Sequence, residues 1–415
     1  MGRIFAKSAE SYFTLVSGVF MKVLVAPMAA MAETGGPFGR ARALAKELLR
    51  RGHAVALCAA EEINYRKVEG VPNYPAPIPS PMGLPEFLGK RMLGFAQATG
   101  MQSRRPVRSF EEVLFIAGAT NETLFRADIH CLLNAIKQFK PDVVFAEFRP
   151  AAIAAARLSG VRCATGFSYP VQKSHAMSPN YSKGAVRCLK ELGLPVPESI
   201  LDLFLWADLR IVPSSPALEP MAYPNTVFTG PFTAATATHP AWEGSRKNVV
   251  VYMGTGTVTA RRLAGLLTKA FTGTEFEVYL ATRQLPQADR GNLHIRDRLD
   301  FSALLPDAAV YLNHGGQNSI MDGLAYGVPQ IVVPGKVFER QYNAASIAEL
   351  EAGVFLGEKQ FKAKNLLAIT RKLGGMQVCF DNAWRAGREL CALGGVGKAA
   401  EEVERLGLLP KSVYK

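Results

Sequence analysis

The sequence lacks the patterns that mark metal sites and nucleic-acid interfaces. Its six cysteines form no Cys-x-x-Cys pair and no histidine stands near them at metal-ligand spacing, so we predict no metal site. Isolated cysteines of this kind are typical of small buried side chains in a reducing compartment, which predicts a cytoplasmic location. Zinc-finger spacing, an aromatic-rich single-strand-binding motif and a long basic helix are also absent, which argues against a nucleic-acid partner.

Long apolar runs are absent as well. No run approaches the roughly 18 residues that span a bilayer. Residues 1–20 carry Arg3 and Lys7 ahead of a mildly apolar stretch, but Glu10 and Ser11 interrupt it, unlike the apolar region of a secretory signal. We expect residues 1–20 to be an extension outside the core, with a short interfacial segment as the alternative.

Basic residues outnumber acidic residues by 48 to 35, which gives a formal net charge of +13. Such an excess suggests an anionic partner, which would be nucleic acid, an anionic membrane surface or a phosphorylated small molecule. The densest basic cluster consists of Lys90, Arg91, Arg104, Arg105 and Arg108. It is either a solvated face or a patch for anionic lipid or an acidic acceptor.

Apolar segments of strand length alternate with segments of helical spacing. The first right-handed parallel unit consists of a strand at 22–27, a Gly-rich turn, an amphipathic helix and a strand at 54–58. The alternation returns over 142–166 and again over 249–333. The pattern predicts an α/β fold of two Rossmann-like domains that face each other across a cleft, with ligands at the carboxyl ends of the strands.

The 415 residues are enough for two such domains. A stretch rich in Ala, Thr, Gly and Pro separates them and predicts a linker. The expected organisation is an extension (1–20), an N-terminal domain (21–232), the linker (233–247) and a C-terminal domain that includes a C-terminal helix (248–415).

The most informative stretch is residues 313–329, Asn-His-Gly-Gly-Gln-Asn-Ser-Ile-Met-Asp-Gly-Leu-Ala-Tyr-Gly-Val-Pro. It follows an expected strand and opens a helix near Asn318 and Ser319. The free N–H groups and the positive dipole end of such a helix suit a phosphate, and the glycines allow close approach. His314 can add a charge-assisted hydrogen bond to a diphosphate. Asp322, one turn further on, can accept hydrogen bonds from ribose hydroxyls.

Continued to Ala344, this stretch resembles the nucleotide-sugar signature of the UDP-glycosyltransferase family, in its bacterial natural-product, macrolide-like branch. The resemblance implies the two-Rossmann-domain GT-B fold and inverting, metal-independent hexosyl transfer to a lipophilic small molecule. The implied co-substrate is a UDP- or TDP-sugar, with no further cofactor. It places the donor contacts on eleven positions: Gly254, Thr255, Arg298, Leu299, His314, Gly316, Asn318, Ser319, Asp322, Glu339 and Arg340.

Three of these positions depart from the family pattern. Arg298 stands where many relatives stack an aromatic on the base, and a guanidinium plane can stack on uracil. Asp322 stands where the family has Glu. Arg340 replaces a Gln. It either binds an acidic group on the sugar, a carboxylate or phosphate, or pairs with Glu339 to hold the loop.

The acceptor base departs most from the family. Relatives carry Gly-His-x-x-Pro before the first helix, and Pro37, which cannot accept a proton, occupies the His position. The remaining candidates are Glu147 at the end of a strand, Glu33 in the Gly-rich turn, and His175. Glu147 has the best expected placement, and its alternative is a salt bridge to Arg149 or a position on the surface.

Two other functions stay open at this point. The loss of the family's base at Pro37 also fits a non-catalytic helper that binds nucleotide sugars. The basic cluster fits a peripheral membrane enzyme that glycosylates a lipid or carotenoid.

Overall fold

The computed structural model describes residues 20–29, 36–62, 65–84, 88, 91, 106–232, 246–254 and 257–409. Several expected features lie outside these residues: nearly all of the extension at 1–20, Glu33, Thr255, most of the linker, and Lys90, Arg104 and Arg105 of the basic cluster.

The first domain is built on a six-stranded sheet in which all neighbouring strands are parallel. Its strands, in spatial order, are β2 (Ala54–Leu57), β1 (Lys22–Pro27), β3 (Val143–Glu147), β4 (Arg162–Gly166), β5 (Leu209–Val212) and β6 (Thr226–Phe228). The surrounding helices are α2 (Gly36–Arg50), α4 (Phe110–Ala117), α5 (Glu122–Phe139), α6 (Pro150–Leu158) and α7 (Pro179–Glu191), with 3-10 turns η2 (Pro81–Gly83), η4 (Tyr169–Val171), η5 (Lys173–His175) and η6 (Ile200–Trp206).

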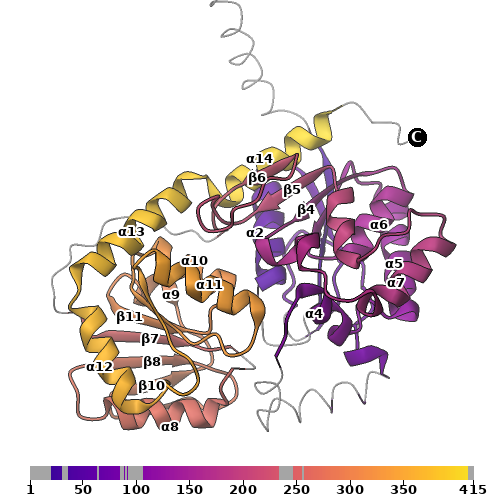
Figure 1. Ribbon diagram of the computed structural model, residues 1–415. Coiled ribbons are helices and arrows are strands. Elements are labelled where there is room, and N and C mark those ends of the chain that lie inside the picture. The colour runs from indigo at the N-terminus through magenta and orange to yellow at the C-terminus, as the bar shows by residue number, and fades with distance from the viewer. Residues whose placement is uncertain are drawn as a thin grey trace, which may run out of the picture.

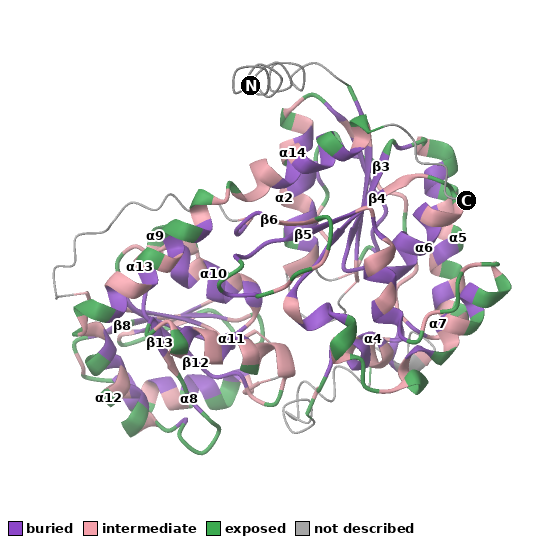
Figure 2. Ribbon diagram, turned by 45° about the horizontal axis from the view of Figure 1, so that its top comes forward, coloured by how far each residue is buried: buried purple, intermediate pink, exposed green. Residues whose placement is uncertain are grey.

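Both faces of this sheet are buried, which explains its continuous apolar strands (Figure 2). Successive residues of β1 enter opposite cores, as the two-residue period of a strand requires. Val23 and Val25 pack with α2, whereas Leu24 and Ala26 pack with α5 and α6. The strand order reverses between β1 and β3, and a ligand crevice is expected outside the carboxyl ends of these two strands.

The second domain is built on a seven-stranded sheet that is parallel except at one edge. Its strands, in spatial order, are β13 (Gly353–Phe355), β12 (Gln330–Val332), β11 (Ala308–Asn313), β7 (Asn248–Tyr252), β8 (Glu277–Ala281), β10 (Leu293–Arg296) and the antiparallel β9 (Ala288–Arg290). Its helices are α8 (Ala260–Phe271), α9 (Phe301–Leu304), α10 (Gln317–Ala325), α11 (Phe338–Glu349), α12 (Ala363–Gly374) and α13 (Gln377–Ala392). Here the strand order reverses between β7 and β11.

The last helix, α14 (Gly395–Leu408), lies against the first domain, although the sequence grouped it with the second (Figure 1). Its buried residues Val403 and Leu406 share a core with β1 and α2. The Glu404 carboxylate accepts hydrogen bonds from Arg51, at 3.1 Å, and from His53 Nε2, at 2.7 Å. The helix therefore ties the end of the chain back to the first sheet.

No helix among the described residues has the length and apolar character needed to cross a membrane. Within the same residues, no cluster of three or more His, Cys, Asp or Glu could hold a metal ion. The six cysteines are free, and four are buried. Cys131 is half-buried, with its Sγ 3.8 Å from that of Cys58.

Candidate functional site

The turn between β11 and α10 is held by side-chain amides. Asn313 Oδ1 accepts a hydrogen bond from the Gly315 N–H at 2.8 Å, and Asn343 Nδ2 donates to the Gly315 carbonyl at 2.8 Å. Gly315 has φ 82°, a conformation that favours glycine. Gly316 precedes α10 without a side-chain cap. The two side-chain amides thus hold the turn without bonding the first N–H groups of α10. An anionic ligand or a neighbouring carboxylate can bind those N–H groups.

His314 lies in this turn and is only 6% exposed. Its ring faces Gly254 at the end of β7, where a Cβ would lie 3.5 Å away, and Gly316, where a Cβ would lie 2.7 Å from Nε2. Among the described residues its Nδ1 has no hydrogen-bond partner. Burial, and then the nearby Arg340, lower the pKa of His314 well below its usual value. The imidazole is therefore neutral at pH 7, and any charge in a hydrogen bond to a diphosphate would come from the phosphate.

The other donor candidates on α10 are close to His314 in the chain but differ in exposure. Ser319 is 4% exposed, and its side chain hydrogen-bonds the buried phenol of Tyr311. Asn318 is half-buried, and its Oδ1 accepts from Arg40 of the first domain at 2.9 Å. Asp322 is half-buried one turn further along the helix.

The two candidates for contact with the nucleobase of the donor differ in exposure. Arg298 is exposed. Leu299 is half-buried and packs with Tyr252 and Phe301.

Glu339 and Arg340 occupy the first turn of α11. Arg340 Nη1 donates to Thr257 Oγ1 at 2.7 Å, so its guanidinium holds the loop after β7. Burial raises the pKa of Glu339, while Arg340 opposes that shift. The Glu339 carboxylate also accepts from the backbone N–H of Gln317, the first residue of α10. A carboxylate of the chain itself therefore binds one of the N–H donors at the start of α10.

Glu147 does not lie open to the cleft, contrary to the prediction. The residue is 1% exposed, and its Oε1 accepts from Arg40 Nε at 2.6 Å. On the other side, a Cβ at Gly166 would lie 2.4 Å from Oε2, so only glycine leaves room for this carboxylate. Its alternative role was also predicted wrongly, because Arg149 pairs with Asp128 and not with Glu147. The sequence located the strand end correctly but not the partner.

His175 lies where the two domains meet. Its ring stands 4.9 Å from that of Tyr169 in the first domain and 4.9 Å from that of Phe338 in the second. Beside it, Tyr169 stacks on Tyr342 with ring centroids 4.1 Å apart. Burial lowers the pKa of His175, so the ring is neutral at pH 7.

Arg40, on α2, is a residue that the sequence reasoning missed. Its Nη1 donates to Asn318 Oδ1 at 2.9 Å and to Gln317 Oε1 at 3.3 Å, across the domain boundary. Gln317 Nε2 in turn donates to the buried Glu219 of the first domain at 2.7 Å. The available signal was local: in the Gly-His-x-x-Pro spacing, Pro37 replaces the His and Arg40 replaces the Pro.

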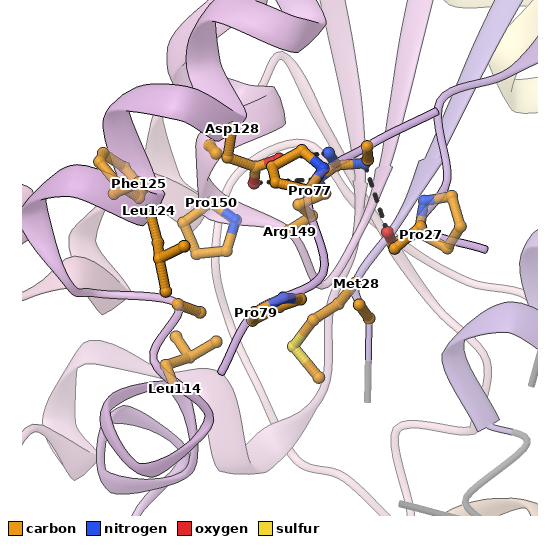
Figure 3. Close-up of a pocket in the computed structure, with 15 residues that line it drawn as sticks. Pro27, Met28, Pro77, Pro79, Leu114, Leu124, Phe125, Asp128, Arg149 and Pro150 are labelled. Atoms are coloured by element: carbon orange, nitrogen blue, oxygen red, sulfur yellow. Dashed lines mark hydrogen bonds and ion pairs between the residues drawn. The ribbon is translucent and has the colours of Figure 1, made fainter. Parts of the chain in front are cut away.

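An open apolar cavity lies outside the carboxyl ends of β1 and β3 (Figure 3). Its apolar lining comes from the end of β1, a Pro-rich loop and helices α4, α5 and α6, and includes Met28, Pro77, Leu114, Leu124, Phe125 and Pro150. The ion pair between Arg149 and Asp128 forms one wall. Such a lining suits a largely apolar ligand with a polar group.

Residues 274–392 match the family described as erythromycin biosynthesis protein CIII-like, C-terminal domain. The matched residues all lie in the second domain. Demethyllactenocin mycarosyltransferase of Streptomyces fradiae is 29% identical over 192 residues, which are 43% of this chain and 40% of that protein. NDP-glycosyltransferase YjiC of Bacillus subtilis is 25% identical over 141 residues, 33% of this chain and 36% of that protein. The matched segments thus span well under half the length of these relatives.

Solved structures resemble the whole chain. The calicheamicin glycosyltransferase CalG4 covers 94% of this chain and 98% of its own, with a TM-score of 0.72 and 18% identity. The spinosyn rhamnosyltransferase SpnG, complexed with thymidine diphosphate, covers 92% and 99%, with a TM-score of 0.65 and 16% identity. The GT-B fold and the resemblance to bacterial natural-product glycosyltransferases are therefore confirmed.

Proposed function

We propose that the protein is an inverting, metal-independent glycosyltransferase that moves a sugar from a UDP- or TDP-sugar to a lipophilic small molecule. The single observation that carries the proposal is the start of α10, whose N-cap residue Gly316 has no capping side chain, beside the buried Nδ1 of His314. Backbone N–H groups, a helix dipole and an imidazole donor together suit a diphosphate. SpnG and VinC, two proteins of the same fold, were solved with thymidine diphosphate, which supports this choice of ligand.

The acceptor would occupy the cavity beside β1 and β3. Its apolar lining supports a lipophilic acceptor, and SpnG has also been solved with spinosyn aglycone. In the reaction, an acceptor oxygen forms a bond to the anomeric carbon from the face opposite the diphosphate. The bond between that carbon and the phosphate oxygen breaks, its electron pair leaves with the nucleoside diphosphate, and the acceptor proton passes to a base.

The donor assignment is tested by thermal unfolding of the purified protein with UDP, with TDP and with their sugars. A ligand at about 100 times its dissociation constant stabilises the folded state by about 2.7 kcal/mol. We expect one of the two nucleotides to raise the Tm of the protein and uridine or thymidine alone to raise it less. Protection by neither nucleotide would overturn the proposal. Binding without release of nucleotide from any sugar would favour the non-catalytic helper.

For the catalytic base we propose His175, because its Nε2 has no hydrogen-bond partner among the described residues, whereas Arg40 seals Glu147. The third candidate, Glu33, lies outside the described residues. Replacing His175 with Asn or with Phe is expected to lower kcat/KM by about 10²-fold, since both variants remove the proton acceptor. Because burial lowers the pKa of His175, the wild-type rate should rise with pH, and the midpoint of that rise should lie below the ordinary histidine pKa of about 6.5. Both variants should lose that rise.

The Phe variant separates the two roles of His175. It keeps an aromatic ring between Tyr169 and Phe338 but has no nitrogen. Activity close to wild type in this variant, with loss only in the Asn variant, would mean that His175 packs the interface and takes no proton.

A further inference from the structure

We propose that Arg40, although it belongs to the first domain, is part of the donor site and contacts the diphosphate leaving group, with Glu147 as the residue that positions it. This inference rests on the proposed function. It assigns the buried pair of Arg40 and Glu147 a role in leaving-group stabilisation rather than in accepting the acceptor proton.

The guanidinium of Arg40 is fixed from both sides of the domain boundary. In the first domain, Nε donates to Glu147 at 2.6 Å and the guanidinium carbon lies 5.0 Å from the centre of the Phe148 ring. From the second domain, the amide oxygens of Gln317 and Asn318 accept from Nη1. Arg40 is 7% exposed, so its side chain cannot turn freely to solvent. Its position is therefore set before a ligand arrives.

The two amides that Arg40 contacts are those of the first two residues of α10. The same turn offers the N–H groups that suit a phosphate, and the unpartnered Nδ1 of His314 lies in the turn just before it. Side-chain amide oxygens are neutral acceptors, whereas a phosphate oxygen is charged and forms a stronger hydrogen bond with a guanidinium. A diphosphate at this turn would therefore compete well for Nη1.

The charge that develops during the reaction favours the same assignment. The Glu219 and Glu147 carboxylates, both buried, lie at the two ends of the chain of hydrogen bonds that passes through Gln317 and Arg40. As the bond to the anomeric carbon breaks, negative charge grows on the departing phosphate oxygen. A preorganised cation beside that oxygen stabilises the transition state more than the bound substrate. Because Arg40 and α10 belong to different domains, this stabilisation requires the two domains to be in contact.

The test compares Arg40→Gln, Arg40→Lys and Glu147→Gln with the wild type, and uses Arg42→Gln on the same helix as the matched control. Calorimetry measures affinity for UDP against uridine, or for TDP against thymidine, using the pair that the wild type binds. We expect Arg40→Gln to weaken the diphosphate at least about 10-fold and the nucleoside less than about 2-fold, and to lower kcat by about 10²-fold. Arg40→Lys and Glu147→Gln should show smaller losses of the same kind, and Arg42→Gln none.

A purely structural tie between the domains gives a different result. In that case, Arg40→Gln lowers Tm and weakens diphosphate and nucleoside equally, or changes neither, and either outcome overturns the proposal. Should Arg40→Gln fail to fold, the same comparison of diphosphate with nucleoside is decided by Arg40→Lys. A wild type that binds neither nucleotide would instead refute the proposed function itself, so the two failures are distinguishable.

Discussion

Replacing His314 with alanine is expected to lower kcat/KM for the sugar donor by about 10²–10³-fold, the usual cost of losing one preorganised donor to a developing anion. The imidazole is packed between the backbone at Gly254 and Gly316, so no other side chain can take its place. Its Nδ1 has no hydrogen-bond partner among the described residues, and the ring also makes a hydrogen bond with the backbone of Tyr252. Steady-state kinetics with the preferred nucleotide sugar measures the effect.

His314→Gln is the matched variant, because its amide can still donate a hydrogen bond. It should keep more activity than the alanine variant. Since burial makes the imidazole neutral, the wild-type KM for the donor should show no step at the usual histidine pKa. If the alanine variant retained wild-type kcat/KM, the diphosphate would have to bind elsewhere.

Features that depend on neighbours in the chain could be predicted from the sequence. One continuous motif contains the turn from Asn313 to Gly316 and the helix after it. Within that motif, Gly315 is the residue type that allows the positive φ found there. The strands could also be predicted, because a parallel strand that is buried on both faces has a short, continuous apolar sequence. The carboxyl ends of β1, β3, β7 and β11 then followed from the topology of such sheets.

Features that depend on distant parts of the chain could not be predicted in this way. Arg40 meets Glu147, 107 positions away, and Asn318, 278 positions away. Without the packing of α2 against both domains, Glu147 looked like an exposed carboxylate at a strand end. The same limit applies to α14, whose apolar face gives no indication of which domain it covers.

Replacing Glu111 with alanine is expected to cost the first domain about 3–5 kcal/mol of folding free energy, the largest stability effect that we predict. Glu111 lies on α4 and is fully buried. Its Oε1 accepts from the hydroxyls of Ser182 and Ser199, each at 2.7 Å. Its Oε2 accepts from the backbone N–H groups of Met177 and Ser178, at 2.9 and 3.2 Å. The substitution leaves four buried or half-buried donors without this acceptor.

Thermal unfolding measures the effect as a fall in Tm of about 6–20 °C for a domain of this size. The matched control is Glu122→Ala on α5, whose half-exposed ion pairs with Arg126 and Arg187 are worth at most about 1 kcal/mol. Because Met177 and Ser178 directly follow the turn that carries His175, hydrogen exchange in Glu111→Ala should rise first over residues 176–182. A fall in Tm no larger than that of Glu122→Ala would show that water replaces the carboxylate at little cost.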